Sequence, residues 1–518
     1  MTALTGLSTL SALTAQSGAV SIDALRLLPA LAPALGALLV LLVDALAPRR
    51  TLPHLVVGAL ALLMGAAGAM PGALSPAREP VLTLCLPGGP DGACLWSAGP
   101  LDSTLQIGLL AASLAALLLL SDQWRDLPGD RAVDVALILA SAAGGAAVVA
   151  ARELGTWLVA LELATLPVIA LVVLRGTRRA AHGGLTLMMT SLLSFAVLVV
   201  GTGLWVMATG DASLSGTAIR TAWAEPDQRA VLVVAILTLF VGLGFKLSLV
   251  PFHAWTPPTF VSGPLPISAL LATASKLAAV GALLALIAPF AGLADPHPHA
   301  LAFVVGALAI GSMLVGTVVA FRATDLVRLL AWSTIAQAGW VVLPLAALTT
   351  VGHRASVAYA LTYAAAGLVA FAVATAVRTA GGEPGSERGL AAYRGLARSH
   401  PHVGGPLILA LLTLAGLPPA ILGLVAKVVA TRPLLAAGLW PLAVLAVIAV
   451  VLGIAVYVRW IAVLLAAPEH RTTAASGNNA GTGVEVQVGP GALAVLSLGT
   501  ALLVVASVVP QVLYGLLS

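Results

Sequence analysis

Apolar stretches of about 20 residues follow one another along almost the whole of this 518-residue chain, and they limit the fold more than any other feature. A helix needs roughly that many apolar residues to cross a bilayer. The pattern predicts fourteen spans, at residues 25–46, 52–70, 103–121, 132–151, 154–174, 184–208, 230–250, 264–288, 300–321, 327–348, 355–377, 404–430, 437–466 and 490–517. We therefore expect an all-α polytopic membrane protein, with one membrane domain over residues 1–518, because helices satisfy their own backbone in lipid.

The composition agrees with a lipid environment. The chain is 60% hydrophobic and 9% charged, whereas soluble domains average about 45–50% apolar and about 25% charged. Its net charge of +5 comes from arginines that flank the apolar runs, which indicates membrane orientation and not binding to nucleic acid. The two cysteines are too few for a metal cluster or a disulfide scaffold.

Arginine is distributed unevenly between the two sets of loops. If the loop with Arg49 and Arg50 is cytoplasmic, the loops on that side carry fourteen arginines and those on the other side carry seven. Because positive residues are enriched in cytoplasmic loops, both termini are expected outside the cytoplasm. Cys85 and Cys94 then lie in an outer loop, where they form either a disulfide or two free thiols.

Lysine is confined to the apolar stretches. The chain has 22 arginines and only three lysines, which are Lys246, Lys276 and Lys427. Lys276 is near the middle of its span, about 15 Å from either surface, so its stem cannot snorkel to water, whereas Lys427 could if its helix ended near residue 430. Arginine stays protonated, but a buried lysine can release its proton. The choice of lysine therefore favours proton transfer; the rival explanation is that a slimmer side chain fits better.

Glu162 is the one carboxylate deep inside a predicted span, where it is the ninth residue of 154–174. A charge at the centre of a membrane helix costs at least about 2.5–3.5 kcal/mol, so a lysine partner is expected. His253 follows Lys246 by seven residues and would share its helix face, either as a proton relay or as a structural histidine. His182 could take up protons at the inner surface. The other histidines fall in or near loops, and no specific role is expected for them.

Two spans contain helix breakers close to a lysine. Pro251 closes the segment that holds Lys246, and Pro419 lies eight residues before Lys427 in "LAGLPPAILGLVAK". Proline removes a backbone donor and frees a carbonyl group. Interrupted helices beside charged groups are typical of ion-handling sites near the bilayer midplane; ordinary proline kinks are the alternative.

Several motifs occur in an order that resembles the antiporter-like membrane subunits of respiratory complex I. They are "GFKLSLVPFHAWTPPTF", "LLATASKLAAV", "RLLAWSTIAQAGW" and "LAGLPPAILGLVAKVVA", together with "LVALELATLPVIAL" for the family's fifth helix and "YVRWIAVLLAAPE" for its thirteenth. The resemblance covers about residues 44–468. Within the family, the lysine at position 427 is typical of subunit N, since the sister subunit M usually carries glutamate there.

The resemblance implies fourteen helices with two inverted five-helix repeats, at about residues 132–288 and 300–466, and with helices 7 and 12 broken. It implies a proton-translocating subunit of NADH–quinone oxidoreductase in the bacterial inner (plasma) membrane, surrounded by other complex I membrane subunits. No cofactor or metal is expected in this chain, because FMN, the iron–sulfur clusters and the quinone site would belong to partner subunits. The implied site residues are the coupled pair Glu162 and Lys246, the central relay Lys276, the terminal group Lys427, and His253 between the lysines.

The chain also departs from the family pattern. Pro258 replaces a common aspartate, and Thr186 stands where the sixth helix usually carries lysine. The stretch "LTYAAAGLVAF" has alanines and glycine where threonine and asparagine are common, and one extra residue lies between Pro419 and Lys427. These departures affect the expected routes of proton uptake and release more than the central groups.

Two other functions are compatible with the pattern. A subunit of a multisubunit Na+/H+ antiporter would have no redox partner and would need a sodium site lined by carbonyls and carboxylates. A passive membrane scaffold would not need buried ionisable groups, and their cost argues against it. Copurification with subunits that show flavin and iron–sulfur absorbance would separate the redox-driven function from the antiporter.

Overall fold

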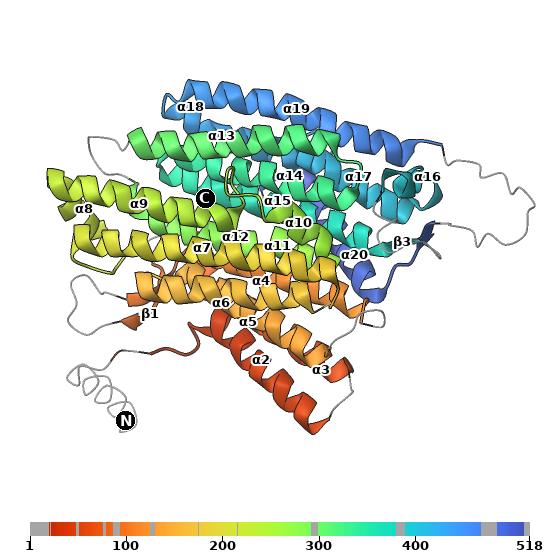
Figure 1. Ribbon diagram of the computed structural model, residues 1–518, viewed down its shortest axis with the longest axis horizontal. Helices are drawn as coiled ribbons and strands as arrows, with labels where there is room; N and C mark the ends of the chain where they lie inside the picture. The colour runs from red at the N-terminus through yellow and green to blue at the C-terminus, as the bar shows by residue number, and fades with distance from the viewer. Residues whose placement is uncertain are drawn as a thin grey trace, which may run out of the picture.

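Long helices run side by side along the longest dimension of the molecule, as Figure 1 shows. The structure is a computed structural model that describes residue 20 and residues 22–47, 51–75, 79–85, 94–124, 130–174, 176–214, 216–291, 299–379, 389–467 and 484–511. Within these residues, thirteen helical segments are long and apolar enough to cross a membrane. They are α2 (Leu28–Leu46), α3 (Thr51–Leu74), α4 (Pro100–Ser121), α5 (Arg131–Ala150), α6 (Leu154–Val173), α7 (Arg178–Thr209), α9 (Pro226–Leu247), α11 (Leu265–Ala272) joined to α12 (Ala274–Ile287), α13 (His299–Arg322), α14 (Leu326–Val342), α15 (Thr350–Ala376), α19 (Trp440–Leu465) and α20 (Pro490–Val508).

The remaining predicted span, residues 404–430, consists of two shorter helices, α17 (Pro401–Ala415) and α18 (Ile421–Ala436). The expected all-α membrane fold is therefore confirmed, and each predicted span has a helical counterpart. The last span was predicted to reach residue 517, but residues 512–518 lie outside the described part of the chain. The connecting segments are α8 (Gly216–Ala224), α10 (Thr256–Ser262), α16 (Leu396–Ser399), η1 (Ala288–Phe290), η2 (Leu343–Ala347) and η4 (Leu390–Tyr393).

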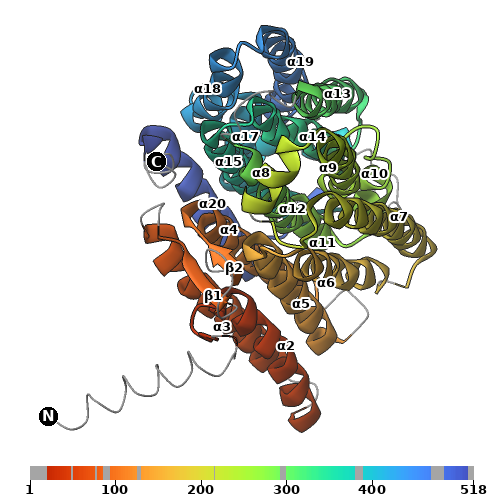
Figure 2. The same cartoon turned by 90° about the vertical axis from the view of Figure 1, so that its left-hand side faces the viewer.

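Burial separates central helices from peripheral ones. In the most apolar part of the α11–α12 span and of the α14 span, 94% of the residues are buried, whereas the value for α7 and α19 is 28%. The end-on view in Figure 2 shows α12, α14 and α15 inside the bundle, with α2, α3, α7 and α19 at its edges. A helix that is apolar on every side belongs in such a centre. Lys276, on α12, consequently lies in the most enclosed part of the molecule.

The seventh predicted span is interrupted immediately after Leu247, where α9 ends. Ser248 adopts a left-handed conformation, with φ 63°. The N–H of Leu249 donates to the carbonyl oxygen of Gly244 at 2.8 Å, which is the long hydrogen bond of a Schellman motif. Because Pro251 follows, the helix cannot simply resume, and the chain turns before α10 begins.

The twelfth predicted span is interrupted in the same way. After α17 ends at Ala415, Gly416 takes a left-handed conformation with φ 78°, which glycine tolerates without strain. The N–H of Leu417 donates to the carbonyl oxygen of Leu412 at 3.0 Å, and Pro418 follows. The predicted breaks in helices 7 and 12 are thus confirmed, and both are built on one turn type.

A further irregularity was not predicted. The span expected to be continuous over residues 264–288 is interrupted at Thr273, between α11 and α12, where φ is −120° and ψ is −78°. The Thr273 hydroxyl donates to the carbonyl oxygen of Ala269 at 2.7 Å, a local bond that competes with regular helix geometry. Lys276 follows within one helical turn.

A disulfide-closed hairpin lies between α3 and α4. The strands β1 (Val81–Cys85) and β2 (Cys94–Ala98) pair antiparallel, and Cys85 is bonded to Cys94. Of the two alternatives that the sequence left open, the structure has the disulfide. The strands themselves were not predicted, because the segment reads as an irregular Gly/Pro loop. A second small sheet pairs β3 (Val377–Thr379) with β4 (Val484–Val486).

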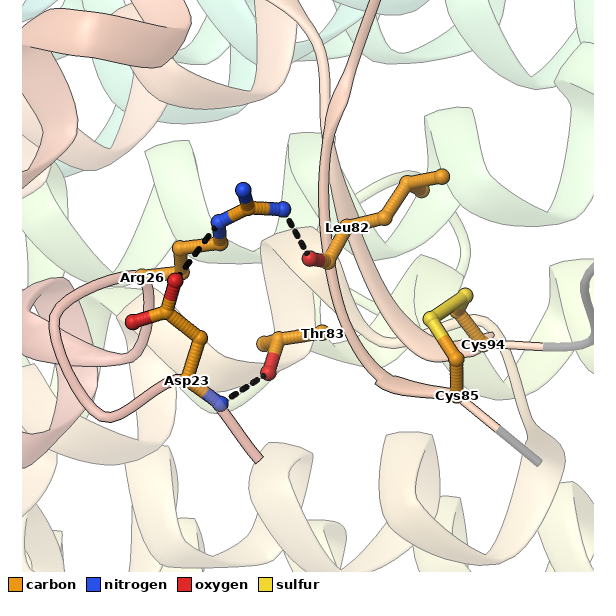
Figure 3. Close-up of a disulfide and its surroundings, with 6 residues drawn as sticks. All are labelled: Asp23, Arg26, Leu82, Thr83, Cys85 and Cys94. Carbon is orange, nitrogen blue, oxygen red and sulfur yellow. Dashed lines mark hydrogen bonds and ion pairs between the residues drawn. A yellow bond between two sulfur atoms is a disulfide. The ribbon is translucent and has the colours of Figure 1, made fainter. Parts of the chain in front are cut away.

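The segment that precedes α2 is bound to this hairpin (Figure 3). The backbone N–H of Asp23 donates to the hydroxyl of Thr83 at 2.9 Å, and the Arg26 guanidinium donates to the carbonyl oxygen of Leu82 at 2.6 Å. Arg26 also pairs with Asp23 at 2.9 Å. The hairpin therefore holds the first described span at its N-terminal end.

A carboxylate from a distant part of the sequence holds the start of the last span, α20. Asp122, just after α4, accepts hydrogen bonds from the backbone N–H groups of Gly491 at 3.0 Å and Ala492 at 2.7 Å. These are orphan donors in the first turn of α20, where a negative charge is also favoured by the helix dipole. Asp122 thus caps a helix about 370 residues away.

The disulfide and the arginine distribution together predict a labelling pattern. Cys85 and Cys94, the only cysteines of the chain, should resist a membrane-impermeant maleimide until a reductant is added. After reduction they should react only when the reagent is on the outer side of sealed vesicles. Labelling from the cytoplasmic side would contradict the orientation, and labelling without reductant would contradict the disulfide. The variant Cys85→Ser, which leaves one thiol, is the positive control.

Candidate functional site

The ammonium group of Lys246 has all three of its hydrogen-bond donors occupied. It donates to Glu162 Oε1 at 2.8 Å, to Thr165 Oγ1 at 2.9 Å and to Ser191 Oγ at 2.9 Å. Glu162 and Thr165 lie on α6, Ser191 on α7 and Lys246 in the last turn of α9. An amino group offers three donors and no acceptor, so this pocket is matched to the protonated lysine. The structure brings together the predicted pair Glu162 and Lys246.

Lys276 is held at the end of the helix that carries Lys246. Its Nζ donates to the carbonyl oxygen of Lys246 at 2.9 Å and to the hydroxyl of Ser248. The ammonium also lies 5.1 Å from the ring centroid of Trp255, within cation–π range. The Ser248 hydroxyl accepts a second hydrogen bond from Thr256 at 2.7 Å. Lys276 is 5% exposed and therefore depends on these neutral partners.

Lys427 has a similar environment at the other break. Its Nζ donates to the carbonyl oxygen of Leu414 at 2.7 Å and lies 3.5 Å from the hydroxyl of Tyr359. The ring of Trp340 is 5.1 Å away. Lys427 is 6% exposed, so it does not snorkel to the surface. A Cβ atom at Gly416 would lie 2.9 Å from its Cδ, so the glycine of the turn also makes room for the lysine stem.

At both helix breaks, the lysine ammonium binds the backbone carbonyl at the equivalent position of the interrupted helix. Lys276 binds the carbonyl of Lys246, two residues before left-handed Ser248, and Lys427 binds that of Leu414, two residues before Gly416. The last carbonyls of a helix lack intrahelical partners and carry its negative partial charge. In lipid such groups must be satisfied by protein. Each interrupted helix therefore supplies an acceptor for one buried ammonium.

A polar cluster surrounds Lys427 that sequence reasoning missed. The side-chain amide of Gln337 donates to Leu414 O at 3.3 Å and to the Tyr457 hydroxyl at 3.0 Å, and it accepts from the Tyr359 hydroxyl at 2.6 Å. Ser333 and Tyr457 are hydrogen-bonded at 2.6 Å. Gln337 is the one amide in "RLLAWSTIAQAGW". Its position inside an apolar span was the sequence signal that could have identified it, and the structure shows that it is buried.

A small cavity separates Lys276 from the polar residues of α15. It measures about 10 Å³ and is lined by Lys276 and Tyr363 among apolar side chains. The Tyr363 hydroxyl donates to Thr334 Oγ1 at 2.8 Å, and Thr334 is three residues before Gln337 on α14. A second cavity of about 20 Å³ lies beside Lys246 and is lined by the hydroxyls of Thr165, Thr190, Ser191 and Ser275 among other residues. Roughly 10–15 Å³ is enough for one water.

The structure corrects the argument made for His253. Because α9 ends at Leu247, no helix connects Lys246 to His253, and the two do not share a helix face. His253 lies in the turn before α10, with its ring 5.3 Å from that of Trp332 on α14. Its contact is therefore with the second half of the bundle.

Two histidines that were expected in or near loops are buried inside helices. His54 on α3 is 2% exposed, and its Nε2 lies 3.3 Å from Asp44 Oδ1. His353 on α15 is 5% exposed. His182 lies in the first turns of α7 and is exposed, as the sequence indicated. Among the described residues, no three His, Cys, Asp or Glu side chains are grouped so that they could hold a metal ion.

Comparison with known proteins places these features in a family. The family model described as NADH:quinone oxidoreductase/Mrp antiporter, TM matches residues 151–453, more than half of the chain. The chain is 38% identical over 463 residues to NADH-quinone oxidoreductase subunit N 2 of Streptomyces griseus subsp. griseus, which covers 87% of this chain and 84% of that protein. It is 36% identical over 463 residues to NADH-quinone oxidoreductase subunit N of Salinispora tropica, with 86% and 85% covered.

Solved structures agree with the sequence relatives. The fold is similar to a chain of respiratory complex I from Thermus thermophilus, with a TM-score of 0.76 and 26% sequence identity. The similarity covers 95% of this chain and 99% of that chain. Sequence, family model and fold therefore agree, and the chain belongs to the NADH-quinone oxidoreductase subunit N family.

Proposed function

We propose that this chain is the proton-translocating membrane subunit N of an NADH–quinone oxidoreductase. In this function the chain moves protons across the membrane through Glu162, Lys246, Lys276 and Lys427, with His253 between the lysines. The observation that carries the proposal is the sequence of contacts at the α9 break: Glu162 binds the Lys246 ammonium, and the carbonyl of Lys246 binds the Lys276 ammonium. Two ionisable groups thus meet at one helix end.

The lysines differ in their partners, which supports distinct roles. Lys246 is paired with a carboxylate at 2.8 Å, and an opposite charge at that distance favours its charged form. Lys276 and Lys427 are bound to carbonyl and hydroxyl oxygens and to aromatic rings. Neutral partners hold a proton less firmly than a carboxylate does, so we assign Lys276 and Lys427 as the groups that receive and release it.

Partner subunits complete the function that we propose. Redox chemistry there, with FMN, iron–sulfur clusters and quinone, would shift the buried charges of this chain, which would have no redox centre of its own. The two repeats at about residues 132–288 and 300–466, as inverted copies, would each provide one broken helix. The alternative, an Na+/H+ antiporter subunit, would need a carboxylate-lined sodium site, but Glu162 is already bound to Lys246. Purification of the intact complex with flavin and iron–sulfur absorbance would support the redox-driven function, and their absence would contradict it.

The substitution Glu162→Gln tests the ion pair. The amide is nearly isosteric and still accepts a hydrogen bond, so the complex should assemble. If the ion pair with Lys246 contributes at least about 1.4 kcal/mol, its loss changes the equilibrium about tenfold. NADH-driven quinone reduction and proton uptake into sealed vesicles should therefore both fall by at least about that factor. Full activity would show that Glu162 is only structural.

The matched control is Glu153→Gln on the same helix. Glu153 caps α6 by accepting hydrogen bonds from Gly155 and Thr156 at 2.7 Å, and glutamine keeps an acceptor there. This variant should therefore retain nearly all of the proton transfer, which isolates the effect of Glu162 from that of removing a charge on α6.

The substitution Lys276→Arg separates a fixed charge from a transferable proton. A guanidinium remains charged under all biological conditions, whereas each proton moved by a relay must be released again against about 2.3 kcal/mol per 100 mV of membrane potential. We expect a well-assembled complex in which proton transfer is reduced at least about tenfold, as in Lys276→Met, which has similar length and no charge. Near-normal pumping by the arginine variant, measured with a pH-sensitive dye, would leave only the fixed-charge role.

A further inference from the structure

His353 is a buried titratable group that the proposed path does not use. It lies in the first turn of α15 and is 5% exposed, and its Nε2 has no hydrogen-bond partner among the described residues. Leaving a buried polar atom unpaired costs folding free energy, so such atoms are rare in native proteins and require an explanation.

The helix that carries His353 presents a row of polar groups that ends at Lys427. His353, Ser356, Tyr359 and Tyr363 are spaced by three, three and four residues on α15, so they lie along one helix face. The Tyr359 hydroxyl is 3.5 Å from Lys427 Nζ. Ser356 is fully buried, and its hydroxyl donates to the carbonyl oxygen of Val341 at 2.7 Å, which leaves its oxygen free to accept.

The other end of this row approaches the outer surface. α15 begins at Thr350, so His353 is roughly 4.5 Å along the axis from the start of the helix. Val351 is 50% exposed. Arg354 next to His353, and Arg432 near the end of α18, belong to the side that the arginine distribution places outside the cytoplasm. His353 therefore stands between the Lys427 cluster and the outer end of the bundle.

We propose that His353 accepts the proton that leaves Lys427 and passes it to the outer side, by way of the hydroxyls of Tyr359 and Ser356. This assignment rests on the proposed function. In each step a hydroxyl oxygen accepts one proton and gives up its own, and the unpaired Nε2 of His353 accepts the last one to form an imidazolium. The Tyr359 hydroxyl must first turn away from Gln337, and the Ser356 hydroxyl from the carbonyl oxygen of Val341, because each now donates its proton there. Imidazole suits such a shuttle because a ring nitrogen can take up one proton and release it again.

The test uses the intact complex in sealed vesicles, with NADH-driven proton transfer and quinone reduction both measured. His353→Gln keeps a hydrogen-bonding side chain but cannot be protonated, and His353→Ala leaves space for a free imidazole. A positioned proton-transfer group typically accelerates a reaction about 10²–10⁴-fold. Because water can replace such a group in part, we expect the rate of proton transfer to fall at least about tenfold in both variants. Added imidazole should restore much of the activity of His353→Ala and none of that of His353→Gln.

The matched control is His54→Ala. His54 is equally buried, but it lies on α3 beside Asp44 and far in sequence from the lysines. This variant, compared per amount of assembled complex, should pump at close to the normal rate and should not respond to imidazole.

Several results would overturn the role of His353. Normal activity in His353→Gln or His353→Ala would exclude it as a relay, and loss of activity in both without rescue by imidazole would assign it a purely structural role. The variant Lys427→Ala shows whether such a result contradicts only the role of His353 or also the proposed function of the chain. If Lys427→Ala stops proton transfer while the His353 variants pump normally, only the outward route is wrong; if Lys427→Ala also pumps normally, the lysine path itself fails.

Discussion

The contact between a buried ammonium group and the free carbonyl at the end of an interrupted helix is the interaction on which the rest of this structure depends. A membrane bundle has no water with which to solvate a lysine, and an unbroken helix has no spare carbonyl to offer. Breaking α9 at Ser248 and α17 at Gly416 creates a helix end with negative partial charge at each position. Lys276 and Lys427 then occupy equivalent carbonyls, at Lys246 and Leu414.

This arrangement also connects the ionisable groups to one another. The residue whose carbonyl binds Lys276 is Lys246, and the ammonium of that residue is bound to Glu162. Any movement of the last turn of α9 must therefore change the surroundings of both lysines together. In the function that we propose, a redox-driven partner would act by changing the position of that turn.

Among the described residues, the contacts that stabilise Lys427 include no carboxylate. Lys427 is surrounded by the carbonyl of Leu414, the hydroxyl of Tyr359 and the ring of Trp340, and Gln337 orders the first two by binding both of them. Tyr359 and Tyr363 on α15 contribute hydroxyl groups that are hydrogen-bonded to Gln337 and Thr334 on α14. The proposed outward route is built on α15.

The sequence by itself determined the membrane spans, the two broken helices, and the position of Glu162 and the three lysines inside the spans, because hydropathy, proline and the cost of a charge in lipid are local properties. The residues alone indicated a lysine partner for Glu162, and the family resemblance named Lys246. Only the tertiary structure decided the other partners. The contact of Gln337 with Tyr457, 120 residues away, was missed because it depends on how the helices pack. The face expected for His253 was wrong because the helix ends first, at Leu247. The burial of His54 and His353, which were expected in or near loops, was not predicted, since a polar residue near the end of an apolar run has the same local pattern whether neighbouring helices cover it or not.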